Sequence, residues 1–313
     1  MSIFYGIDNI GATLLTNHLE INMKSFLDAG FLNSGGFINI HRPVKNVHSN
    51  PLYKLYTVND PNFKTGQIWQ TARKDWVYES GIVDDRHQPI QISGIYINNT
   101  FYDTNTTGQY AYNIDYKNSR IIFQNRQSPS LNIEMSHSYR WVQVYNYTDA
   151  QWWQELQYNT NNNEEHRQNR EKGDFTVPAH QRVQMPAIVI ETVARGSAKP
   201  FRLGDKSLRI DQDFLFHIVA NNYHDRNNIT DILRYQEDKV LKFYDVDAIV
   251  RDQKHALNYD GTLNPNRLSY MDMINNYTWN TCRLKNMVLS EVESVNADLF
   301  ECNIRTTAEI IVV

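Results

Sequence analysis

Apolar and polar side chains alternate along the last part of the chain. From Phe300 onward, one set of alternate positions carries Glu301, Asn303, Arg305, Thr307 and Glu309. The set between them carries Phe300, Cys302, Ile304, Thr306, Ala308, Ile310 and Val312. Because successive side chains of a strand point to opposite faces, this period of two is typical of a half-buried antiparallel strand.

The rest of the second half also divides into clear elements. Apolar runs predict strands, apolar residues at helical spacing predict helices, and Asn and Pro mark turns. The predicted order is strand 185–194, strand 208–220, helix 225–236, strand 240–244, helix 266–276, and a hairpin of 285–295 with 299–312. This order predicts an α+β domain, in which an antiparallel sheet carries helices packed on one face.

Short strands separated by turn residues fill the first half, from Phe37 to about Thr148. Asn is favoured in tight hairpin turns, because it tolerates a left-handed backbone. The predicted hairpins join 90–97 to 100–103 around Asn98-Asn99, 110–116 to 120–124 around Lys117-Asn118-Ser119, and 131–136 to 139–147. Strands at this regular spacing predict a β-rich domain of the sandwich or barrel-like type.

An amphipathic helix is predicted near the start, over residues 11–29. Its apolar stripe includes Leu15, Leu19, Met23 and Phe26, at the spacing of one helical face. A terminal helix of this kind can pack on its own core or on a neighbouring subunit. We therefore keep these four residues as candidates for a subunit interface.

A second interface candidate is the aromatic pair Trp152-Trp153. Adjacent residues of a short helix cannot both face one core, and aromatic residues are enriched at interface centres. Three interpretations remain open: a junction within the same chain, a contact between subunits, and a platform for carbohydrate.

The predicted domain organisation has four parts. An N-terminal helix and arm spans 1–36, the β-rich domain 37–158, a polar linker 159–176, and the α+β domain 177–313. The linker prediction rests on a segment without a periodic apolar face, NTNNNEEHRQNREKG.

Composition excludes several function classes. The formal net charge is −4, so nucleic acid is not the expected main partner. The start carries no secretory signal pattern, and no apolar run is long enough to span a bilayer, so we expect no membrane association. Cys282 and Cys302 are expected to be small buried residues, with a disulfide as the alternative. The chain holds no GxGxxG, P-loop, GxSxG, HExxH or CxxC motif.

Two His-containing groups could bind a metal ion. His217, His224 and Asp225 lie close in sequence, but zinc needs three or four convergent ligands. The structural alternative is a strand histidine followed by Asp225 as a helix cap. Asp84 and Asp85 with His87 could also hold a cation, and a solvated turn is the alternative.

Asp211 and Asp213 share one face of a predicted strand. Two carboxylates on one face are the minimum for a glycoside hydrolase, but only scattered Trp and Tyr residues could form a sugar groove. We expect no catalytic residue, no cofactor and no metal.

The second domain resembles the tail-terminator and neck proteins of tailed bacteriophages. The resemblance lies in MPAIVIETVAR, in LGDKSLRIDQDFLFHIVANNYHDRNNITDILRYQ, and in the final strand pair. The first half, with FLNSGGFINI, ISGIYINNTFY, DYKNSRIIF and SYRWVQVY, is similar to β-rich virion proteins of marine phages. The chain is longer than a minimal tail terminator, so the β-rich domain would be an addition to that module.

The resemblance implies a structural virion protein without catalysis. Such a protein forms a ring of six or twelve copies at the head-tail neck or the top of the tail, closed by cyclic symmetry. Its partners would be further copies of itself and adjacent neck, connector, tail-tube or sheath proteins. DNA would pass through the lumen without specific binding, which an acidic net charge suits.

Two other functions remain alternatives. A receptor- or carbohydrate-binding tail protein would use Trp and Tyr side chains of the β-rich domain, although the chain lacks the repeats of tail fibres. An enzyme such as a glycoside hydrolase would need carboxylates clustered in a cleft.

Overall fold

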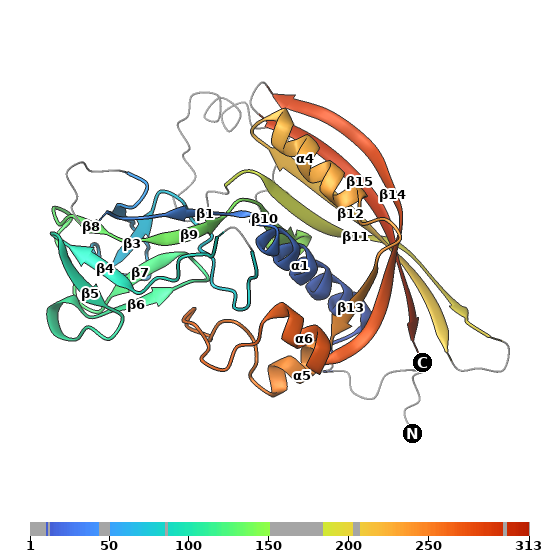
Figure 1. Ribbon diagram of the computed structural model, residues 1–313, viewed down its shortest axis with the longest axis horizontal. Helices are drawn as coiled ribbons and strands as arrows, with labels where there is room; N and C mark the ends of the chain where they lie inside the picture. Colours follow the sequence, from blue (N-terminus) through green and yellow to red (C-terminus); the bar gives the residue numbers. More distant parts are fainter. Residues whose placement is uncertain are drawn as a thin grey trace.

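The computed structural model describes residues 11, 13–43, 51–84, 87–150, 184–202, 207–296 and 299–312. Its fold is α+β, as the sequence predicts, with a large curved sheet beside several smaller antiparallel sheets (Figure 1). None of the described helices is long and apolar enough to cross a membrane.

The large sheet has six strands and carries most of the second half. Its spatial order is β10 (Gln143–Asn146), β11 (Ala187–Pro200), β12 (Leu208–Ala220), β15 (Leu299–Val312), β14 (Thr278–Asn296) and β13 (Val240–Tyr244). Neighbours are antiparallel except β10 and β11, which run parallel. Three bulges in the β14–β15 ladder accompany the strong curvature of these strands, because each bulge bends and twists its strand (Figure 1).

Two helices cover the same face of this sheet, and one of them was predicted to pack there. They are α1 (Leu15–Asn33) and α4 (Tyr223–Arg234). Phe214 and Phe216 of β12 and Ile304 of β15 point to this face, are fully buried, and share one core with both helices. The alternation seen in the sequence therefore separates a helix-covered face from a polar face.

The helix α4 begins differently from the prediction. Asn222 is its cap: the Asn222 side chain accepts a hydrogen bond from the Asp225 backbone N–H at 2.8 Å. Its amide in turn donates to the Asp225 carboxylate at 2.7 Å. Asp225 thus bonds the side chain of the cap residue and is not the cap itself.

Two short helices follow β13. The sequence analysis missed α5 (Val246–Arg251), and α6 (Tyr270–Asn276) begins later than the predicted residue 266. Side chains of Asp245 and Ser269 cap them by accepting backbone hydrogen bonds at 3.0 and 3.1 Å. The Asn264 side chain accepts from the Asn266 backbone N–H, so a turn occupies the first predicted residues of α6.

The β-rich part consists of three small antiparallel sheets. Their spatial orders are β1 (Phe37–Ile40) with β9 (His137–Arg140); β2 (Leu55–Thr57), β3 (Ile68–Thr71), β7 (Arg120–Phe123) and β6 (Tyr112–Asp115); and β5 (Thr100–Asp103), β4 (Gly94–Ile97) and β8 (Ile133–Glu134). Short 3₁₀ helices span Gly108–Tyr110 and Tyr147–Asp149. Trp69 and Trp76 lie in the shared core of this part.

Two of the three predicted hairpins are confirmed. β4 pairs with β5, and Asn98 and Asn99 have φ of 47° and 68°, the left-handed backbone that a tight hairpin needs. β6 pairs with β7, and Ser119 has φ of 51°. The third hairpin is wrong, because β8 pairs with β4, β9 with β1, and β10 with β11.

The pairing of β10 changes the division of the chain. β10 and α1 come from the first half, yet both pack with the large sheet. The larger unit therefore includes residues that the sequence analysis placed in the N-terminal arm and in the β-rich domain. The predicted linker 159–176 lies outside the described residues.

Candidate functional site

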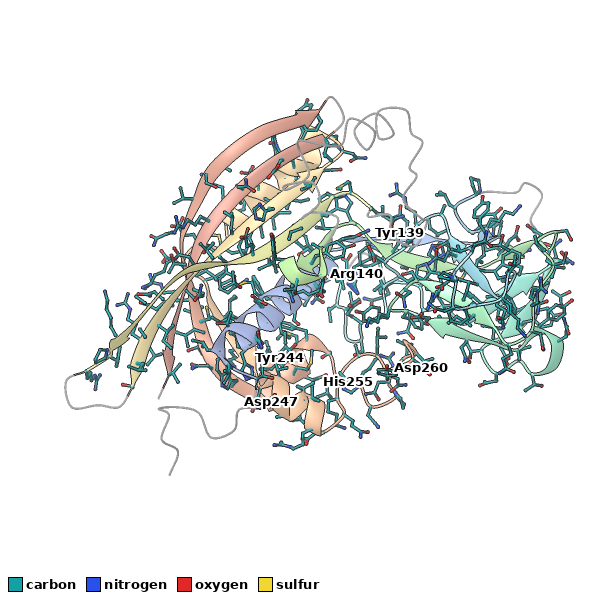
Figure 2. All side chains as sticks on the ribbon, turned by 180° about the vertical axis from the view of Figure 1, so that it is seen from behind. Tyr139, Arg140, Tyr244, Asp247, His255 and Asp260 are labelled. Carbon is teal, nitrogen blue, oxygen red and sulfur yellow. The ribbon has the colours of Figure 1, made fainter. Side chains whose placement is uncertain are left out.

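α1 touches the sheet and the α5–α6 region. Asn22 and Tyr244 join it to β13, and Lys24, Asp28 and Asn33 turn towards the β-rich part. Figure 2 shows Arg140 near one end of α1 and Asp247 near the other. Each end of α1 thus carries a group of charged side chains.

Arg140 is the centre of the first group. Its guanidinium lies 3.5 Å from Asp28 of α1, bonds Glu79, and stands 4.9 Å over the Tyr78 ring. Lys24 pairs with Asp28 at 2.5 Å. Burial acts to lower the pKa of Arg140, but Glu79 and Asp28 raise it overall, so the cation is firmly held. The group joins three segments that are distant in sequence.

The pKa values of Asp75 and Glu79 are both raised by burial near Arg140. Burial raises the pKa of Asp75 to about 6, although Arg140 and Lys24 act to lower it. Burial also raises the pKa of Glu79 against the opposing effect of Arg140. The cations beside these two acids therefore do not fully compensate their burial.

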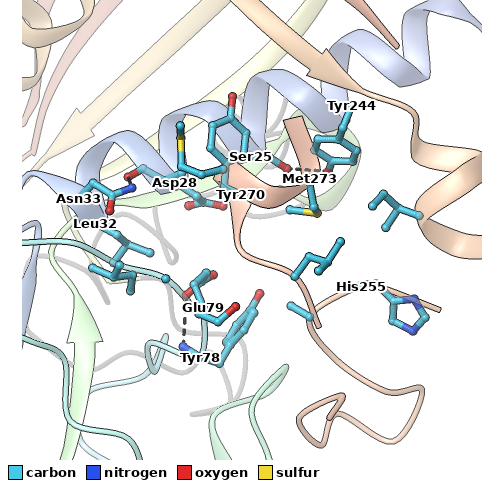
Figure 3. Close-up of a pocket in the computed structure, with 18 of the residues that line it drawn as sticks. Ser25, Asp28, Leu32, Asn33, Tyr78, Glu79, Tyr244, His255, Tyr270 and Met273 are labelled. Carbon is cyan, nitrogen blue, oxygen red and sulfur yellow. Dashed lines mark hydrogen bonds between the residues drawn. The ribbon is translucent and has the colours of Figure 1, made fainter. Parts of the chain in front are cut away.

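A cavity of about 200 Å³ lies next to this group. Figure 3 shows its lining: Ser25, Asp28, Leu32 and Asn33 from α1, Tyr78 and Glu79 from the β-rich part, and Tyr244, His255, Tyr270 and Met273 from the α5–α6 side. Burial raises the pKa of Tyr78, Tyr244 and Tyr270, so these phenols stay neutral. Ligand pockets usually span roughly 300–1,000 Å³, which makes this cavity a small one.

The cavity also lacks an activated nucleophile among its described residues. Ser25 Oγ shares a hydrogen bond of 3.0 Å with the neutral Tyr244 hydroxyl rather than with a base. A serine needs an adjacent general base to attack a substrate. The Ser25 hydroxyl is therefore part of the contact between α1 and β13.

The second group lies at the other end of α1. A ring nitrogen of His18 and carboxylate oxygens of Asp245 and Asp247 all lie within 4.8 Å of one another. The His18 ring stacks on Trp279 of β14, with ring centres 4.3 Å apart. Burial lowers the pKa of His18, although Asp245 and Asp247 act to raise it.

The polar face of the sheet holds three of the residues singled out for chemistry, His217, Asp211 and Asp213. His217 lies between Glu191 and Asn303, with nitrogen–oxygen distances of 2.7 and 2.8 Å. His224 is exposed on the first turn of α4, and within the described residues it forms no cluster of possible ligands with His217 and Asp225. The predicted metal group is therefore not brought together.

The two carboxylates of β12 have separate partners. Asp213 accepts from Arg305 at 2.5 Å and from Thr307 at 2.7 Å. Asp211 lies 3.6 Å from Arg209. Each aspartate is thus part of a cross-strand or local ion pair, and Asp213 is 8% exposed. In the first half, Asp84 pairs with His87 at 3.0 Å, and Asp85 lies outside the described residues.

The interface candidates of α1 divide into two kinds. Leu19 and Met23 are buried in the core of the large sheet, so their side chains offer no surface to a neighbouring subunit. Leu15 and Phe26 are half-buried and pack against the same core. Of the two alternatives for this helix, packing on the protein's own core is the one that describes Leu19 and Met23. Trp152 and Trp153 lie outside the described residues.

The large sheet has two open edges. A row of cross-strand neighbours divides the sheet into two halves; it runs through Ile190 of β11, Phe216 of β12, Ile304 of β15 and Leu289 of β14. On one side of this row β10 covers the β11 edge, and no described strand covers β14. On the other side β13 covers β14, and no described strand covers β11 (Figure 1). The open edges therefore lie diagonally opposite each other.

Apolar side chains are exposed along these edges. Val288 and Leu289 of β14 are 58% and 39% exposed, and Phe201, next to the end of β11, is 43% exposed. An open strand edge with exposed apolar side chains is a template for pairing with another chain. We take the two edges as the candidate functional site.

Sequence reasoning missed the Arg140 group, the His18 group and the open edges. The members of each charged group are far apart in the chain and carry no local motif. The one sequence signal is the acidic pair in the segment YDVDAIV, which also fits a helix cap.

Comparison with known proteins adds no family to this description. The chain matches no protein-family model and no curated protein.

Proposed function

We propose that this chain is a structural virion protein of a tailed bacteriophage, which forms a ring at the head-tail neck or at the top of the tail. The observation that carries the proposal is the pair of diagonally opposed open edges on the large sheet. The phage assignment itself rests on the sequence resemblance.

The strand directions suit head-to-tail pairing between copies. Counting across β12 and β15, β11 and β14 run antiparallel to each other. A second copy placed beside the first in the same orientation brings its β11 edge against β14, and the pairing is antiparallel. Such an interface uses two different surfaces, and it gives a ring when the rotation between copies closes.

The diagonal offset sets the geometry of that contact. The free part of β14 begins at Lys285. Before it, the Leu284 backbone N–H donates to the Lys239 carbonyl and the Leu284 carbonyl accepts from the Asp238 N–H. The free part of β11 begins at Glu191. Neighbouring copies must shift along the strands for the two free parts to meet, as strands do when a sheet closes into a barrel.

The polar face of the sheet suits passage of DNA without strong binding. Its Arg305 pairs with Asp213, and Arg209 and Lys285 both pair with Glu309. Phosphate binding depends on cations that are free to replace counterions. Paired cations on this face would hold DNA weakly if the face lines the lumen. Adjacent neck, connector, tail-tube or sheath proteins would complete the assembly.

The described tryptophans do not favour the carbohydrate-binding alternative. Trp69 and Trp76 are buried, and Trp141 and Trp279 pack against the core of the large sheet. A stacking platform needs an exposed ring face. Tyr56 and Phe101 of the β-rich part are 42% and 46% exposed, so a glycan platform within the described residues would use these rings rather than a tryptophan.

The test is the solution mass of the purified full chain together with electron micrographs of negatively stained particles. The proposal predicts closed rings of six or twelve copies whose mass does not change with dilution. A trimer that binds glycans would support the receptor-binding alternative and overturn the ring proposal.

A further inference from the structure

Three side chains with metal-binding atoms converge at the N-terminal end of α1. His18 comes from the helix, and Asp245 and Asp247 come from the start of α5, more than two hundred residues later in the chain. Their ligand atoms lie within 4.8 Å of one another. Within the described residues, no other group of three His, Cys, Asp or Glu side chains is so placed.

His18 has an unused nitrogen in a closed environment. The residue is 4% exposed, and its Nδ1 atom has no hydrogen-bond partner among the described residues. A buried polar atom without a partner is costly, so it points to a missing ligand or water. Stacking on Trp279 fixes the plane of the ring, and hence the direction of both nitrogens.

The two carboxylates lack a cation. No described Lys or Arg lies within ion-pair distance of Asp245 or Asp247, and the nearby Arg251 pairs with Asp252 instead at 3.0 Å. Two negative groups beside a neutral imidazole attract a divalent ion. Among the described residues, the cluster therefore has no ion-paired cation, and His18 Nδ1 has no hydrogen-bond partner.

Hydrogen bonds already hold both acids in place. Asp247 accepts from the Thr13 backbone N–H at 2.8 Å and from the Thr13 hydroxyl at 2.5 Å. Asp245 accepts from the Ala248 backbone N–H at 3.0 Å. Each carboxylate oxygen has a second lone pair, so these bonds orient the acids and leave capacity for a metal.

We propose that His18, Asp245 and Asp247 bind one divalent transition-metal ion, for which Zn²⁺ is the probe. One imidazole and two carboxylates are ligands that Zn²⁺ accepts at about 2.0–2.2 Å, with water in the fourth position. Ligand atoms around such an ion are about 3.4 Å apart, and the three groups already lie within 4.8 Å of one another, so small side-chain movements suffice for binding. The ion joins the start of α1 to α5.

The test uses the full chain, stripped with EDTA and titrated with ZnCl₂ by calorimetry, with MgCl₂ as the comparison. The proposal predicts one Zn²⁺ per chain, a higher Tm on binding, and much weaker Mg²⁺ binding. His18→Gln and Asp247→Asn are each expected to weaken Zn²⁺ binding by about 100-fold or more. His224→Gln, which changes an exposed histidine of α4, is the matched control and leaves the affinity unchanged.

A second measurement remains informative if a variant folds poorly. Co²⁺ in place of Zn²⁺ reports its ligands by visible absorption, and the wild-type protein should give the spectrum of a four-coordinate ion with one nitrogen and several oxygen ligands. The proposal is overturned if the wild-type chain takes up no stoichiometric Zn²⁺ or Co²⁺. Equal binding by wild type, His18→Gln and Asp247→Asn also overturns it, because the ion is then adventitious and held by histidines at the surface.

Discussion

Asn22 of α1 and Tyr244 of β13 form a closed pair of hydrogen bonds across 222 residues of sequence. The Asn22 side chain donates to the Tyr244 carbonyl oxygen at 3.0 Å and accepts from its backbone N–H at 2.8 Å. The amide thus occupies the place of a neighbouring strand at the end of β13. It is fully buried, so no water can replace it.

Replacing this amide should therefore destabilise the whole large unit. Asn22→Ala leaves the N–H and C=O of Tyr244 buried without partners, at a cost of about 2–4 kcal/mol in the free energy of unfolding. Chemical denaturation measures this change. Asn227→Ala, at an exposed position of α4, is the control and should change stability by less than about 0.5 kcal/mol. Equal effects for the two variants would show that the Asn22 bonds do not matter.

The ion group of Arg140 gives a second prediction. Arg140→Met leaves Glu79 buried without its cation and leaves Asp28 with Lys24 alone, so we expect a loss of about 3–5 kcal/mol. Adding Glu79→Gln should recover part of that loss, because one uncompensated charge is then removed. Arg234→Met, in an exposed pair on α4, should have little effect. Denaturation curves that show no recovery in the double variant would contradict this account.

The buried Asp75 carboxyl predicts that its contribution to stability falls as pH rises. Burial raises its folded-state pKa to about 6, above the ordinary value of 3.8. Its contribution to stability is complete below pH 3.8 and is lost as pH rises through about 6, because the unfolded chain ionises first. Asp75→Asn should stabilise the protein by about 1–2 kcal/mol at pH 7 and by little at pH 4.

The same substitution at Asp60 provides a control of opposite sign. The Asn62 backbone and Arg120 lower the pKa of Asp60, so its ionised form stabilises the fold. Asp60→Asn should destabilise the protein at pH 7 and have a smaller effect at low pH. Parallel pH profiles for the two variants would contradict the assignment.

The buried His137 ring predicts the opposite pH dependence, in which stability falls as pH decreases. Burial lowers its pKa to about 4, so the folded protein disfavours the protonated ring. Because the unfolded chain binds the proton first, stability is lost as pH falls from about 6.5 to about 4, by about 2–3 kcal/mol. His137→Leu should remove this part of the pH profile. Thermal melts across that range test it, and an unchanged acid dependence would contradict it.

Local pattern predicted the parts of the fold that local interactions decide. The alternation from Phe300 to Val312 is the ladder of β15, and Asn98-Asn99 forms the predicted turn. The pairing of β8, β9 and β10 was not predictable in this way. These strands are short, and each finds a partner from a distant segment, so tertiary packing selects the partner.

The charged groups escaped prediction for a related reason. Asp28, Glu79 and Arg140 meet only when α1 packs between the large sheet and the β-rich part. α5 is too short for a helical period to be visible, so Asp245 and Asp247 had no assigned position beside His18. The polar residues of β12 and β15 were visible in sequence, but only their cross-strand register shows that they neutralise one another.

The most direct test of the ring proposal is a comparison of two variants by light scattering. Val288→Lys places a charge on the open β14 edge, and Val250→Lys makes the same change on α5 at 59% exposure, nearly that of Val288. The account predicts a closed particle of six or twelve copies for wild type and Val250→Lys, and a smaller species for Val288→Lys. The same closed particle in all three proteins would contradict pairing through the β14 edge.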